Sequence, residues 1–196
     1  GDSPSLLNSS YTITADIEIP QDGAEGMILT SGGRFAGYGF YLLEGKPVFL
    51  WNLINLKRIK WEGPEALPPG RHTLEFDFKY DGMGAGTFAY NSMSGVGQSG
   101  TGTLKVNGKV VDTKPMKRTL PIILQWDEAF DIGSDTLTGV NDADYKPPFP
   151  LTAKLNKLTI KVDRPKLSEE DIKKLENTQA IAVDGNPIHH MQGGPH

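Results

Sequence analysis

The sequence predicts an all-β protein, an antiparallel sandwich of two sheets. Apolar and polar residues alternate with a period of two, most clearly at residues 11–19 and 74–80, as in strands with one buried face. The 196-residue chain also contains 23 glycines and 14 prolines, which indicate many turns. No helical pattern is interleaved with the strands, which favours a sandwich over a parallel α/β fold.

The first half of the chain reads as a series of short strands separated by turns. Residues 11–19 end at the turn Gln21-Asp22-Gly23, and the next strand ends at Gly32-Gly33. A hairpin is expected across residues 44–47, because that stretch has turn composition between two apolar runs. The expected strands of this half lie at residues 11–19, 27–31, 38–43, 48–53 and 57–61.

The second half begins after Pro68-Pro69-Gly70, which stops any preceding strand. A Gly- and Ser-rich loop follows Asp81, and Asn107-Gly108 is the strongest short hairpin signal in the chain. The expected strands of this half lie at residues 74–80, 104–106, 110–112, 122–126, 129–132 and 151–162.

The composition changes after Pro165, so the chain is expected to have two parts. Residues 1–164 form the sandwich domain, and residues 165–196 form a short helix and an extended tail. Ser168 begins a run that resembles a helix-capping box, and the predicted helix ends near Asn177.

Charge and composition disfavour several classes of function. The net charge is −4 and the pI is near 5.6, with no stripe of Lys or Arg, so nucleic-acid binding is disfavoured. No apolar stretch approaches the ~20 residues that span a bilayer, so no membrane span is predicted. The chain has no cysteine, which removes disulfides, thiol catalysis and thiolate metal sites.

Carboxylates that alternate along two predicted strands resemble part of the acidic set of sandwich glucanases. Asp16 and Glu18 form one such pair, and Glu75 and Asp77 form the other. Neither stretch supplies a third acid in register, because Lys79 follows Asp77. Solvent-facing strands show the same alternation, so no catalytic residue and no enzymatic activity are predicted.

The acidic segment at residues 127–144 is the best metal candidate. Calcium takes six to eight oxygen ligands from loop carboxylates and carbonyls. Turn-capping next to Gly133 and Gly139 is the competing explanation of the acidic residues, and it requires no cofactor. The predicted calcium ligands are Asp131, Asp135, Asp142 and Asp144.

Three residues are predicted to contact a ligand. Arg34 follows two glycines at the rim of a sheet, where it could bind an anionic group or pair with a carboxylate of its own domain. Trp61 and Tyr90 lie beside predicted loops, where an exposed ring could stack on a sugar.

An ordered set of segments resembles the C-terminal β-sandwich of bacterial arylsulfatases. The resemblance covers about residues 8 to 163. The matching segments are residues 11–20, 23–26, 31–35, 45–48, 67–72, 76–82, 102–109, 130–133 and 155–162.

The resemblance implies a concanavalin-like or laminin-G-like jelly roll that packs against a sulfatase-like catalytic domain, in a periplasmic or secreted protein. The Cys/Ser-x-Pro-x-Arg motif of sulfatases is absent, so no catalytic residue transfers to this chain. The leading hypothesis is therefore a non-catalytic accessory domain. The alternatives are a carbohydrate-binding, lectin-like module and, third, a sandwich glycoside hydrolase.

Overall fold

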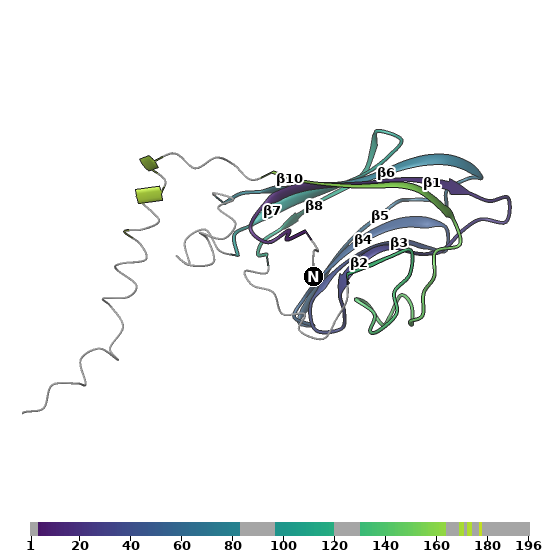
Figure 1. Cartoon of the computed structure of the whole chain (residues 1–196), viewed down its shortest axis with the longest axis horizontal. Helices are drawn as coiled ribbons and strands as arrows, with labels where there is room; N and C mark the ends of the chain where they lie inside the picture. The colour runs from purple at the N-terminus through teal and green to yellow at the C-terminus, as the bar shows by residue number, and fades with distance from the viewer. Residues whose placement is uncertain are drawn as a thin grey trace, which may run out of the picture.

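The computed structural model confirms the predicted all-β sandwich. It describes residues 4–82, 97–119 and 130–163, and also 169–170, 172–173 and 177. Two antiparallel sheets of five strands each lie face to face (Figure 1). The strands are β1 (Ser10–Ile19), β2 (Gly26–Gly32), β3 (Gly37–Leu43), β4 (Lys46–Leu53), β5 (Lys57–Glu62), β6 (Gly70–Tyr80), β7 (Gly100–Val106), β8 (Lys109–Met116), β9 (Phe130–Ile132) and β10 (Lys154–Asp163).

The two sheets, which we call sheet I and sheet II, differ in the order of their strands. Sheet I has the order β10-β1-β6-β7-β8, and sheet II has the order β5-β4-β3-β2-β9. The sheets approach each other along the β5–β8 side, where the Glu62 backbone N–H donates to Asp112 Oδ2 at 3.0 Å. Lys114 Nζ also donates to the Lys60 carbonyl at 2.7 Å across this side.

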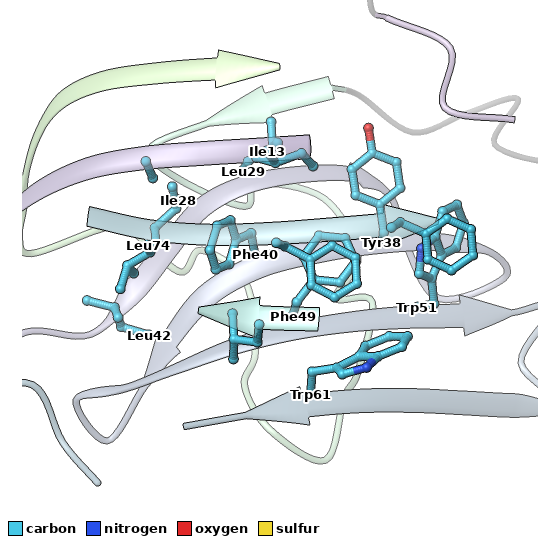
Figure 2. Close-up of a cluster of buried hydrophobic side chains, with 14 of the residues drawn as sticks. Ile13, Ile28, Leu29, Tyr38, Phe40, Leu42, Phe49, Trp51, Trp61 and Leu74 are labelled. Carbon is cyan, nitrogen blue, oxygen red and sulfur yellow. The ribbon is translucent and has the colours of Figure 1, made fainter. Parts of the chain in front are cut away.

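The alternation in β1 and β6 has the expected effect on burial. Every second side chain of β1 is buried, and Ile13 lies opposite Phe76 of β6 in the register of sheet I. Aromatic rings fill the space between the sheets (Figure 2). Phe49 of sheet II stacks on Phe76 of sheet I with ring centroids 3.5 Å apart, and Trp61 meets Phe76 edge-on at 4.9 Å.

Several predicted boundaries differ from the observed ones. β7 and β8 are both longer than predicted. The first inward positions of β7 are Gly100 and Gly102, which give no apolar alternation for the sequence to show. β10 begins at Lys154 rather than at residue 151. The predicted strand at 122–126 lies outside the described residues, as do most residues of the predicted helix and tail. Among the described residues, no helix is long and apolar enough to cross a bilayer.

The two ends of the sandwich carry different turns, and one hydrogen bond shows which end of sheet I lies over which end of sheet II. The Trp51 Nε1–H donates to the Tyr11 hydroxyl at 2.8 Å, which places the end of β4 over the start of β1. We call this end, with the turns at residues 33–36 and 54–56, the β4–β5 end. The opposite end, with the turns at residues 44–45 and 107–108, is the β7–β8 end.

Candidate ligand-binding site

The outer face of sheet II is covered by the chain itself. Between β9 and β10, residues 133–153 cross this face, and they appear as the green segment below β2 and β3 in Figure 1. We call residues 133–153 the covering segment. A second apolar cluster lies beneath it, formed by Met27, Tyr41, Val48, Leu50, Val140 and Tyr145. Sheet II is therefore packed on both faces.

Backbone hydrogen bonds hold the covering segment in place. Asp135 and Phe149 pair with each other through their backbone groups at 3.0 and 3.4 Å, and the Met27 N–H donates to the Phe149 carbonyl at 3.1 Å. Gly26 lies directly under Pro150, and a Cβ at this glycine would stand 2.0 Å from the Pro150 carbonyl oxygen. The close approach requires glycine at this position.

The four predicted calcium ligands lie on or beside this segment. Asp131 accepts a hydrogen bond from Thr136 Oγ1 at 2.8 Å, and Asp142 pairs with Arg34 Nε at 2.8 Å. The structure thus gives Arg34 the internal carboxylate partner that was one of its two predicted roles. Both side chains of that pair are partly exposed, so the pair adds little stability.

The other two carboxylates are engaged by buried tyrosines. Asp135 accepts from the Tyr145 hydroxyl, and Asp144 accepts from the Tyr41 hydroxyl, both at 2.5 Å. Lys60 Nζ lies 2.7 Å from Asp144. Burial, together with the adjacent carboxylate, raises the pKa of Tyr41 and of Tyr145 above the ordinary tyrosine value.

The described residues contain no group of three or more His, Cys, Asp or Glu side chains arranged to hold a metal ion. The four carboxylates instead contact separate donors of the sandwich. Calcium binding by this segment stays a prediction from the sequence.

The predicted aromatic contacts have different outcomes. Trp61 is fully buried between the sheets, against Phe49 and Phe76, so its ring faces the core and not a ligand (Figure 2). The sequence suggested exposure because Trp61 precedes a loop, but alternation in β5 directs its side chain inward. Tyr90 lies outside the described residues.

The outer face of sheet I carries polar side chains from all of its central strands. The acid pairs considered for catalysis lie there in separate contacts: Asp77 accepts from Thr12 Oγ1 at 2.7 Å, and Glu75 pairs with Lys105 Nζ at 2.7 Å. That hydrogen bond with Glu75 raises the pKa of Lys105. Glu75 and Asp77 are therefore held as cross-strand partners of neighbouring residues.

A polar pocket of about 500 Å³ lies on this face at the β7–β8 end. Three strands and one turn contribute to it. Its polar lining consists of Asp16 from β1, Arg71, His72 and Thr73 from β6, Asn107 from the β7–β8 turn, and Asn156 from β10.

A hydrogen-bond chain fixes one wall of the pocket. Thr73 Oγ1 donates to Asp16 Oδ1 at 2.8 Å, and Asn107 Oδ1 accepts from the Thr73 N–H at 2.9 Å. His72 contacts the Pro68 carbonyl through Nε2 at 2.8 Å and the Asn107 amide through Nδ1 at 3.1 Å. These partners fit an imidazole that carries its proton on Nε2.

A β-bulge shapes the opposite wall. In the β1–β10 register, Asp16 lies opposite Lys157 and Ile17 opposite Leu155, so Asn156 is the extra residue of β10. Bulges redirect a side chain relative to regular alternation. Asn156 is exposed and lines the pocket, while Arg71 extends into solvent with its Nε 3.9 Å from Glu18. Sequence reasoning noticed Asp16 only as half of an acid pair, because bulges and register leave no local signature.

Comparisons with known proteins support the fold. Domains LG4-5 of the mouse laminin alpha1 chain match with a TM-score of 0.55 and 13% identity, over 85% of this chain and 40% of that chain. This chain thus spans less than half of the laminin chain that it matches. The match shows a laminin-G-like sandwich, of the concanavalin-like type that was predicted.

Two further structures are similar at lower scores. The CBM40 of the Ruminococcus gnavus IT-sialidase, bound to alpha2,6 sialyllactose, has a TM-score of 0.49 and 14% identity, over 87% of this chain and 84% of that one. Sheep galectin-11 in complex with glycerol has a TM-score of 0.43 and 12% identity, over 81% and 95%. No protein-family model and no curated protein sequence matches the chain, so the arylsulfatase resemblance gains no support.

Proposed function

We propose that this chain is a non-catalytic carbohydrate-binding module whose sugar ligand occupies the polar pocket of sheet I. The observation that carries the proposal is the lining of that pocket. One carboxylate, one imidazole, one hydroxyl and two amides line a volume of about 500 Å³, and the exposed Arg71 stands at its edge. Sugar hydroxyls both donate and accept hydrogen bonds, and this set offers both kinds of partner.

The position of the pocket supports the same function. Sheet II has its outer face covered by residues 133–153, whereas the pocket lies on the outer face of sheet I. Asp16 and Thr73 are already held by hydrogen bonds, so binding a sugar there orders few additional side chains. Asn156 and Arg71 are two exposed groups of the lining, and they would reach the ligand from its two sides.

The proposal is tested by glycan-array screening of the full chain, followed by titration calorimetry with a sugar that binds. Asn156→Ala and Arg71→Ala should each weaken binding about tenfold, the effect of losing one good hydrogen bond. Lys79→Ala is the matched control, because Lys79 is exposed on the same face of β6 at its far end. A chain that binds no glycan, or an Asn156→Ala variant with unchanged affinity, would contradict the proposal.

The second candidate function is that of an accessory domain beside a sulfatase-like catalytic domain. The sequence segments that resemble the arylsulfatase module are the observation that favours it. A carbohydrate-binding role is compatible with such a parent enzyme and with a secreted or periplasmic protein. The reading frame upstream of Gly1 tests this candidate. A Cys/Ser-x-Pro-x-Arg motif there would support it, and an upstream region without one would contradict it.

A further inference from the structure

Exposed apolar side chains gather at the β4–β5 end of the sandwich. Six large apolar side chains are exposed in the described part of the chain, and four of them lie on loops at this end. Phe35 is 74% exposed and Leu56 is 84% exposed, while Ile54 and Leu137 are 45% and 55% exposed. Single exposed apolar residues are ordinary, but a group of four on neighbouring loops indicates an interaction surface.

Hydrogen bonds join the 33–36 turn, the 54–56 turn and the loop of Leu137 into one surface, which we call the platform. Asn52 Nδ2 donates to the Gly33 carbonyl at 2.9 Å and to the Arg34 carbonyl at 2.8 Å, which links the 54–56 turn to the 33–36 turn. The Arg34 N–H then donates to Thr138 Oγ1 at 3.0 Å, which adds the loop of Leu137. The four apolar side chains therefore stand on a fixed base.

The backbone at Ile54 is a second, independent observation. Ile54 has a φ of 47° and Asn55 has a φ of 57°, so both turn residues adopt the left-handed conformation. A β-branched residue rarely occupies this region, which glycine and asparagine adopt at lower cost. A strained isoleucine whose apolar side chain is also 45% exposed suggests a role for that side chain at the surface.

The charge of the platform indicates the chemistry of the partner. Arg34 lies on the 33–36 turn, and Lys57 and Arg58 begin β5 directly after the 54–56 turn, although the whole chain has a net charge of −4. Arg34 pairs with Asp142, whereas Lys57 is an exposed cation directly beside the apolar side chains. Two copies meeting through this end would bring like charges together. An anionic partner fits this surface better than a second copy.

We propose that the β4–β5 end docks on the surface of an anionic lipid membrane, with the apolar side chains inserted between the headgroups. The side chains stand on three separate turns, and a fluid lipid surface accepts such tips without a matching shape. Cationic residues beside them gain from the negative surface potential of anionic lipids. This inference does not depend on the glycan pocket, which lies at the opposite end of the sandwich.

The absence of native cysteine allows a site-specific test on the full chain. Leu56→Cys labelled with an environment-sensitive fluorophore should become brighter and blue-shifted with phosphatidylserine-containing vesicles, and much less so with phosphatidylcholine alone. Val110→Cys is the control, because Val110 is also an exposed apolar residue (52%) but lies on sheet I, near the β7–β8 turn. Its label should not respond.

Co-sedimentation with the same vesicles measures affinity. Phe35→Ser combined with Leu56→Ser should weaken vesicle binding by at least tenfold, Lys57→Gln should weaken it severalfold, and Val110→Ser should leave it unchanged. The absence of binding to phosphatidylserine vesicles, or equal responses of the labels at positions 56 and 110, would overturn the proposal. So would vesicle-independent capture of an acidic protein by the same tips, which would assign the surface to a protein partner.

Discussion

At the scale of single residues, three hairpin turns of this sandwich adopt positive φ angles with different residues. The β7–β8 turn uses Asn107 and Gly108, with φ angles of 51° and 79°. The β3–β4 turn likewise ends in a glycine, whereas the β4–β5 turn places Ile54 at a φ of 47°. Asn-Gly is the sequence that such turns favour. Ile54 is therefore the residue at which local propensity and structure disagree, as is common at functional positions.

We expect Ile54→Asn to raise the free energy of unfolding by about 1 kcal/mol, because asparagine tolerates the left-handed conformation that strains isoleucine. Urea denaturation at neutral pH measures this change. The same variant should bind phosphatidylserine vesicles more weakly, so stability and binding should move in opposite directions. A loss of stability would show instead that packing of the Ile54 side chain outweighs the backbone strain.

At the scale of elements, the sequence predicted strands wherever inward positions carry large apolar side chains. Residues 11–19 and 74–80 were recognised for this reason, and the Asn107-Gly108 turn was recognised from its composition. The start of β7 was missed because its inward positions hold Gly100 and Gly102. A Cβ on Gly102 would lie 2.6 Å from the ring of Trp61, so the neighbouring aromatic occupies the space that a side chain would need.

The site was less predictable than the strands, for a different physical reason. Its polar groups come from β1, β6, β10 and a turn, and a sequence window cannot show which strands become neighbours. The acidic residues of the covering segment were visible in the sequence, but the partners of Asp135 and Asp144 were not. Two of those partners are tyrosines, Tyr145 and Tyr41, whose burial depends on residues 133–153 crossing sheet II.

The contribution of the covering segment to stability can be tested at Gly26, which lies against Pro150. We expect Gly26→Ala to lower the free energy of unfolding by about 2–4 kcal/mol, because the new methyl group would collide with the Pro150 backbone. Gly23→Ala is the matched control: Gly23 also has a positive φ but no atom within 4 Å of an added Cβ. Its cost should be about 1 kcal/mol, from the backbone conformation alone. Equal losses in urea denaturation would show that residues 133–153 contribute little to stability.

At the scale of the whole molecule, the two proposed surfaces lie at opposite ends of the sandwich. The β4–β5 end carries the exposed apolar tips, and the pocket lies at the β7–β8 end of sheet I. A module docked on a membrane through its tips would therefore hold the pocket away from the lipid, toward a glycan in solution or on a neighbouring molecule. The polar pocket and the apolar tips share no residue, so substitutions that abolish binding at one surface should leave binding at the other unchanged.

Stability of the whole fold should depend on pH through its buried tyrosines. Burial is the largest cause that raises the pKa of Tyr11, Tyr41 and Tyr145 above the ordinary value of 10.0. Below that value both folded and unfolded chains keep these protons, so the tyrosines make stability neither rise nor fall. Above it the unfolded chain releases protons that the folded chain retains, and each tyrosine lowers the free energy of unfolding by about 1.4 kcal/mol per pH unit.

We therefore expect the urea midpoint to be steady from pH 7 to about 9 and to fall steeply above pH 10, with tyrosinate absorbance appearing together with unfolding. Tyr41→Phe should be less stable at neutral pH by about 1–2 kcal/mol, since the hydrogen bond to Asp144 is lost. Its alkaline decline should nevertheless be shallower, because one buried proton-binding group is gone. A midpoint that stays constant through pH 11, or tyrosinate that forms while the chain remains folded, would contradict the burial of these hydroxyls. If Tyr41→Phe removed that tyrosinate signal, the covering segment would not seal sheet II.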